Sequence, residues 1–273
     1  MLGAFYLIFA VTLDPEIYGE LSYLISIAGT VSIIARFGTP HNVVVYRSKE
    51  NHLLSNQLNV FAVITVGIAS VILISIDVYT ALLCFTSTMF ILNLQNLLGL
   101  KKYKKFLLFS VIRGGFVIIL TVGLYFVLDI PGIILGLAIG NIITTLSFFK
   151  SLRFNIHSFD KLRSNFKVLL HNFGVDSSQS VINWIDKLLI VPLFGFVLVG
   201  LYQFNFQILL TLSILPTALH SFLLSERSSG KKQTKINRLT IFTSVVLVIV
   251  IIFISPNIIE QIFPKFIEGI FAL

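Results

Sequence analysis

Apolar runs of about 20 residues recur along this 273-residue chain and are separated by short polar gaps. A helix of that length crosses the roughly 30 Å hydrocarbon core of a bilayer. An isolated strand cannot satisfy its backbone hydrogen bonds in lipid, and the sequence lacks the period-two alternation of a membrane barrel. The chain is therefore predicted to be an all-α, polytopic membrane protein.

Nine membrane-spanning helices are expected. Their approximate bounds are 1–13, 17–36, 58–76, 79–100, 106–128, 130–152, 172–194, 197–224 and 239–255. The first is short for a bilayer, because 13 residues of helix cover only about 20 Å. We interpret it as the end of a longer helix rather than a signal peptide, since no basic region or small-residue cleavage site accompanies it.

Charge alternates between the gaps. Of the 20 Lys and Arg residues, 17 lie in every second gap, whereas Asp14, Asp77 and Asp129 mark the others. Because cytoplasmic loops are enriched in Lys and Arg, the even-numbered helices are predicted to end in the cytoplasm. The N-terminus is then predicted to face the cytoplasm, and the protein is predicted to lie in the cytoplasmic (plasma) membrane. The net charge of +8 reports on insertion, so we expect membrane lipids as partners and no nucleic acid.

A repeat with an offset of 181 residues (200 − 19) relates two of the expected helices. The matching pairs are Gly19 with Gly200, Ile27 with Ile208, Thr30 with Thr211, Ser32 with Ser213, and Ile33 with Ile214. The copies lie six helices apart and point the same way, as in transporters built from parallel repeats. The alternative is chance similarity between apolar helices.

The repeat predicts two six-helix lobes. The first covers residues 1–155 and is followed by a cytoplasmic linker, 156–171. The second covers 172–273 and is incomplete, with helices seven to nine and the start of a tenth. We therefore expect parts of the fold to be missing at both ends of the chain.

The helix expected over 172–194 is the least apolar span. Its polar side chains recur every three or four residues on one face, and they include Asp176, Gln179, Asn183, Asp186 and Lys187. A charge near the bilayer centre costs about 2.5–3.5 kcal/mol on insertion scales and is tolerated where it faces a cavity or a partner. These residues are candidates to line a cavity that contacts a polar substrate or carries protons. The alternative is a packing contact or a local neutralisation of Asp186 by Lys187.

Two arginines are further candidates for a substrate-binding cavity. Arg113 lies about 10 Å into the fifth helix, where it would offer a planar fork to a phosphate or carboxylate. Its alternatives are snorkelling to the headgroups and close packing beside Gly114 and Gly115. Arg36 ends the second helix, as an anchor or as a cavity residue.

The sequence shows no motif for catalysis, a cofactor or a metal. It has no phosphate-binding glycine loop, and its five His residues lack metal-ligand spacing. The single cysteine, Cys84, excludes an intrachain disulfide. We expect neither enzyme activity nor a cofactor.

Four stretches carry a family resemblance. They are Pro15–Tyr23 with Ala35–Gly38, Gly99–Tyr103, Asn183–Ile190 and Val199–Tyr202. In order and spacing they resemble the polysaccharide (O-antigen-type) flippases of the multidrug/oligosaccharidyl-lipid/polysaccharide exporter superfamily, whose members have more helices than this chain.

The resemblance implies flipping of a lipid-pyrophosphate-linked oligosaccharide by alternating access, for cell-surface polysaccharide biosynthesis and without ATP. Cavity cations would then meet the pyrophosphate, and Arg36, Arg113 and Lys187 are the positions that could serve. The resemblance also admits other membrane proteins of polysaccharide assembly as partners.

Three other functions stay open at this point. A cation-coupled drug or small-molecule antiporter of the same fold would need an acid within the first six helices, and none lies well inside them. A membrane glycosyltransferase would need a sizeable catalytic loop, and the loops are short. The third is an inactive fragment.

Overall fold

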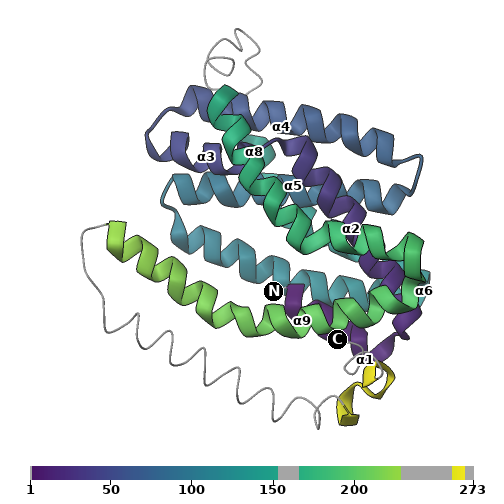
Figure 1. Ribbon diagram of the computed structural model, residues 1–273. Coiled ribbons are helices and arrows are strands. Elements are labelled where there is room, and N and C mark those ends of the chain that lie inside the picture. Colours follow the sequence, from purple (N-terminus) through teal and green to yellow (C-terminus); the bar gives the residue numbers. More distant parts are fainter. Residues whose placement is uncertain (1, 153–165, 229–259, 268–273) are drawn as a thin grey trace. The chain divides into compact units, whose positions relative to one another are not determined.

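The computed structural model describes residues 2–152, 166–228 and 260–267, without the side chains of 2–4, 144, 147, 150, 151, 179 and 212–228. Every regular element in these residues is a helix, and none of them is a strand (Figure 1). The elements are α1 (Leu2–Thr12), α2 (Pro15–Arg36), α3 (Thr39–Ser48), α4 (His52–Leu73), α5 (Val78–Gly99), α6 (Tyr103–Ser151), α8 (Phe166–Ser180), the π-helix η1 (Val181–Ile185), α9 (Asp186–Ser228) and the 3₁₀-helix η2 (Pro264–Phe266). The predicted all-α class is confirmed.

Five of the described helical stretches are long and apolar enough to cross a membrane. They are α2, α4, α5, Tyr103–Ile143 within α6, and Phe166–Thr211 through α8, η1 and α9. The chain is therefore a multi-pass membrane protein by the length and composition of its helices. The expected span at 239–255 lies outside the described residues.

Two of these long stretches contain a break where the sequence analysis separated two spans. Asp129 in α6 has φ 51° and ψ −135°, and Gly195 in α9 has φ 78° and ψ −179°. Both conformations lie outside the helical region, so each helix consists of two arms. The predicted boundaries at 128/130 and 194/197 are confirmed at these residues.

Three glycines spaced by four, Gly132, Gly136 and Gly140, let the arms of α6 pack together. A Cβ on Gly136 would lie 2.6 Å from the backbone nitrogen of Thr121, and one on Gly140 would lie 2.6 Å from Cγ2 of Val117. Because residue numbers rise along one arm as they fall along the other, the arms are antiparallel. Small residues at this spacing are typical of close helix contacts in membranes.

One helix, α3, was not expected, because the sequence analysis treated 37–57 as a gap. Gly38, at φ 69°, turns the chain after α2, and Pro40 stands in the first turn of α3, where its missing N–H costs nothing. The helix buries Val43 and packs against α4, α5 and α8. α4 likewise starts at His52, six residues before the expected start at 58, with the side chain of Asn51 as its N-cap.

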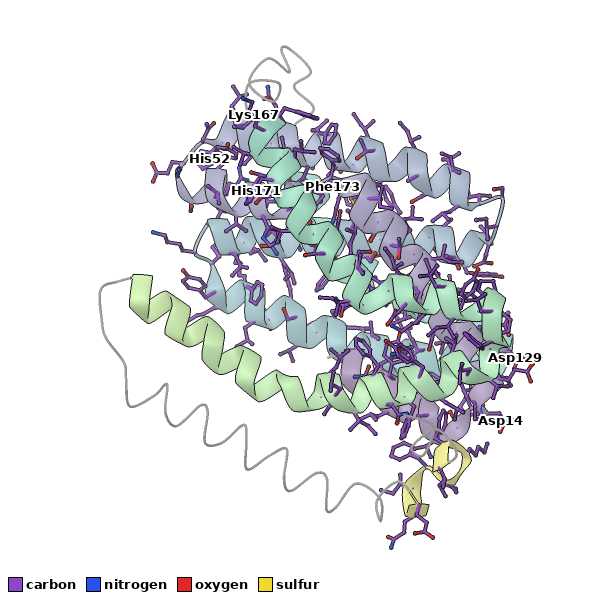
Figure 2. The ribbon with its side chains drawn as sticks, in the orientation of Figure 1. Asp14, His52, Asp129, Lys167, His171 and Phe173 are labelled. Carbon is purple, nitrogen blue, oxygen red and sulfur yellow. The ribbon has the colours of Figure 1, made fainter. Side chains whose placement is uncertain are left out.

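The described chain forms two compact units, residues 21–193 and residues 1–20 with 194–273. Within 21–193, Lys167, His52 and His171 lie toward one end and Asp129 lies at the other (Figure 2). This separation agrees with the charge alternation of the sequence. The lobes predicted at 1–155 and 172–273 stay a prediction.

The core of the 21–193 unit combines apolar packing with one polar pair. Its buried apolar residues are Val43, Leu54, Leu58, Ala62, Met89, Leu92, Phe148 and Leu169. Beside them, Asn59 of α4 and Asn96 of α5 exchange two amide hydrogen bonds of 3.1 Å each. The pair joins the two helices and satisfies both amides away from water.

Replacing Asn59 by Leu is expected to lower the free energy of unfolding by about 1–2 kcal/mol, because Asn96 loses its partner in a buried site. Asn59→Leu/Asn96→Leu should cost less than the sum of the two single changes, since no orphaned amide remains. Denaturation in detergent micelles measures this coupling. Thr65→Val is the control, because among the described residues Thr65 Oγ1 donates to carbonyls of its own helix, those of Phe61 and Ala62. Additive costs would contradict the pairing.

Cysteines placed at Lys102 and at Asp129 are expected to react with membrane-impermeant reagents from opposite sides of the membrane. Lys102 stands directly before the first arm of α6, and Asp129 stands between the two arms. The first arm, of about 26 residues (103–128), is long enough to cross a bilayer. Labelling of intact cells and of inverted vesicles measures the sidedness. Reaction of both cysteines from one side would refute the topology.

Candidate functional site

Arg113, on the first arm of α6, points toward the neighbouring helices. Its Nε donates a hydrogen bond of 2.6 Å to Asn141 Oδ1 on the second arm. Its Cζ lies 4.5 Å from the ring centroid of Phe90, near the middle of α5. The glycine-lined contact between the arms brings Asn141 within reach, since Asn141 directly follows Gly140. The side chain is thus held by an amide and an aromatic face, the arrangement of a cation–π contact.

Asp176 of α8 lies between two basic side chains. Its Oδ1 is 2.9 Å from His41 Nε2 of α3, and its Oδ2 is 3.6 Å from Arg36 Nε at the end of α2. The carboxylate is almost fully buried and so is Arg36, whereas the His41 side chain is 55% exposed. A buried carboxylate next to a guanidinium is neutralised, so the cluster ties three helices together without a net buried charge.

His41 is the titratable member of this cluster that lies outside the membrane-spanning helices. The hydrogen bond to Asp176 raises the pKa of His41 above its ordinary value of 6.5, and the negative charge of Asp176 adds to this. Partial burial and the charge of Arg36 lower it, without reversing the direction. Protonated His41 is therefore favoured in the folded protein.

The end of α2 meets α8 through aromatic rings and a glycine. Phe37 stacks on Phe173 with ring centroids 4.5 Å apart, and on Phe166 at 5.7 Å. Gly38 lies so close to α8 that a Cβ would be 2.5 Å from the backbone nitrogen of Phe173. These contacts set the position from which Asp176 reaches Arg36.

The π-helix η1 comes directly before Asp186 and Lys187. Lys187 Nζ donates to the backbone carbonyl of Asn183 at 2.6 Å and lies 3.3 Å from Asp186 Oδ1. The same carboxylate oxygen accepts the backbone N–H of Lys187 at 2.8 Å, which turns Asp186 toward its neighbour. The Lys187 side chain is only 1% exposed. This geometry is the local neutralisation that the sequence analysis kept as its alternative.

Trp184 fixes η1 on α2. A Cβ on Gly29 would lie 2.7 Å from Cε2 of Trp184, so the indole covers this glycine. The Lys187 ammonium lies 5.8 Å from the centre of the same ring. π-Helical turns of this kind occur frequently at functional sites.

The three cation candidates differ in their partners. Arg36 faces Asp176 and Lys187 faces Asp186, whereas Arg113 is held by a neutral amide. Within the described residues, Arg113 has no carboxylate within ion-pair distance. It therefore keeps a positive charge inside the apolar helices that no acid among those residues offsets.

The remaining candidates are placed as follows. Asn183 contributes its backbone carbonyl to Lys187, and the side chain of Gln179 lies outside the described residues. His41, Phe90 and Trp184 were not singled out from the sequence. The indole of Trp184 had a visible signal, since it stands between Asn183 and Asp186, but His41 had none.

No protein-family model matches the chain, and neither a curated protein nor a solved structure matches it.

The Asp176–His41 contact is expected to stabilise the protein most at low pH. A group whose pKa is raised on folding contributes its stabilisation fully below its unfolded pKa, near 6.5, and loses it as pH rises through the folded pKa. Thermal unfolding in detergent between pH 6 and pH 9 should show this loss in the parent protein. His41→Gln should reduce this dependence of the unfolding temperature on pH, while His52→Gln, at the start of α4, should leave the dependence unchanged. Equal pH profiles for parent and His41→Gln would contradict the assignment.

Proposed function

We propose that the protein is a membrane transporter that flips a lipid-pyrophosphate-linked oligosaccharide across the cytoplasmic membrane for cell-surface polysaccharide biosynthesis. The resemblance of the four sequence stretches supports this assignment, and so do the helices long enough to span a membrane. Alternating access between two repeated lobes is the proposed mechanism, with the basic loops and the N-terminus in the cytoplasm. No catalytic step is involved.

The observation that carries the proposal is that Arg113 lies inside the apolar helices with no acid beside it among the described residues. A pyrophosphate entering the membrane must meet a cation, because charge is costly in hydrocarbon. Arg113 has the required charge, and its guanidinium spends only Nε on Asn141 among the contacts of the described residues. The two terminal nitrogens form the planar fork that suits phosphate oxygens.

Arg36 and Lys187 have a different proposed role. Each is neutralised by an aspartate in this arrangement, so an anion would have to displace the carboxylate to bind. We assign Arg36 to holding α2 against α8 and Lys187 to holding the turn from η1 into α9, with anion contact only when their pairs open. The antiporter alternative gains no support, because Asp176 and Asp186 are both engaged by cations.

Replacing Arg113 by Gln in the protein's native host is expected to lower surface polysaccharide at least tenfold, since a charged hydrogen-bond donor is worth about 1.5–3 kcal/mol. Arg113→Lys should retain part of the activity, because a point charge replaces the fork. Asn141→Asp should resemble Arg113→Gln, because it places a carboxylate where the amide now contacts Nε. Glycan staining of whole cells measures the surface polysaccharide, and immunoblots of membranes measure the amount of each variant protein.

Lys105→Gln is the matched control, because Lys105 is an exposed cation at the start of the same helix. It should leave glycan levels unchanged. If Arg113→Gln and Asn141→Asp both keep the wild-type amount of surface polysaccharide at equal amounts of protein, the proposal is wrong. Loss of drug resistance in place of glycan would favour the antiporter.

A further inference from the structure

Two glycines bring the start of α2 and the second arm of α9 into backbone contact. A Cβ on Gly19 would overlap the carbonyl oxygen of Phe196, and a Cβ on Gly200 would overlap the carbonyl oxygen of Pro15. Each glycine thus meets the carbonyl four residues before the other glycine. Both helix segments belong to the same compact unit.

The register of this crossing equals the offset of the sequence repeat. Any two crossing helices have an approximate local two-fold axis, so the informative fact is which residues are paired. Gly19 corresponds to Gly200 (200 − 19 = 181), and Pro15 corresponds to Phe196 (196 − 15 = 181). Gly19 therefore lies beside its repeat counterpart Gly200, and the matching residues Pro15 and Phe196 each contact the glycine of the other copy, as in an isologous interface between two copies.

Residues 260–267 pack across the same two helix segments. Phe266 is fully buried, with its ring centroid 5.3 Å from that of Tyr18 on α2 and 4.7 Å from that of Phe204 on α9. Both of these rings are buried as well. One inserted side chain thus contacts both partners of the crossing.

An ion pair adds a second attachment. Lys265 Nζ lies 2.8 Å from Asp14 Oδ1, in the turn between α1 and α2. The two side chains are 45% and 64% exposed, so water and salt weaken the attraction. The pair therefore fits a contact that forms and breaks readily.

We propose that residues 260–267 are a clasp that holds the Gly19–Gly200 crossing closed and that releases when the transport pathway opens at the end where Asp14 lies. This inference rests on the proposed transport function, because alternating access requires two arrangements of the helices. Glycine backbones approach closely without interlocking side chains, so this joint separates without repacking a core. Phe266 supplies the side-chain contact that the glycines lack.

Cysteine accessibility in the full protein tests the clasp. The probe is Val199→Cys in a Cys84→Ser background, because Val199 is fully buried directly before Gly200. A membrane-impermeant maleimide is added from outside. Phe266→Ala should speed labelling at least about tenfold, since removing a buried Phe weakens the closed state strongly. The matched control is Ile262→Ala, an exposed residue of the same segment, which should change nothing.

A charge swap tests the same contact without touching the buried rings. Asp14→Lys and Lys265→Asp should each speed labelling of Val199→Cys, and the double variant should return it toward the parent rate. If Phe266→Ala fails to reach the membrane, the labelling rates of the charge-reversal variants alone test the clasp. Parent labelling rates in Phe266→Ala and in both single reversals, with a cysteine at Asp129 labelled equally throughout, would overturn the clasp.

The two proposals fail in different ways. If labelling responds as expected but Arg113→Gln leaves surface polysaccharide intact, the clasp stands and the proposed substrate is wrong. If Arg113→Gln abolishes polysaccharide and the labelling does not respond, the transport function stands without the clasp.

Discussion

Polar side chains that enter an apolar helix bundle must find their partners inside the protein, and this constraint sets the local structure wherever it acts. Among the described residues it acts, for example, at Asn59 with Asn96, Arg113 with Asn141, Asp176 with Arg36 and His41, and Lys187 with Asp186. Each pair except the last joins different helices or different arms of one helix. The apolar surface, which faces lipid and protein alike, supplies little of this specificity, because hydrocarbon tails solvate it equally well.

The boundaries of the spans were predictable because they depend on local chemistry. A single acid, Asp129, between two apolar runs and a glycine, Gly195, after another run mark the breaks, and both residues adopt backbone conformations outside the helical region. The charge alternation likewise survives in the position of Asp129 at the end away from Lys167 (Figure 2). What hydropathy alone could not reveal was α3, since its buried face is only four residues within a polar gap.

The partners of the candidate residues were less predictable, because they come from distant parts of the chain. Asp176 was placed on a polar helix face, but its neighbours Arg36 and His41 precede it by more than 130 residues (176 − 41 = 135). No spacing rule within one helix connects them. The Asp186–Lys187 contact was predicted only as the alternative to a cavity, because helix geometry turns adjacent side chains apart. In the structure the Asp186 carboxylate accepts the backbone N–H of Lys187 and so turns toward its neighbour.

The partner of a buried cation decides what that cation can do. A lysine or arginine paired with a carboxylate adds no net charge, so binding an anion there requires breaking an existing contact. A neutral amide instead orients the guanidinium and leaves its charge available, which is the situation of Arg113 and Asn141. The net charge of +8 therefore says little about recognition, since most of it lies in loops and part of the remainder is cancelled locally. Selectivity for a phosphate group would rest on a single side chain whose charge is kept by the chemistry of its neighbour.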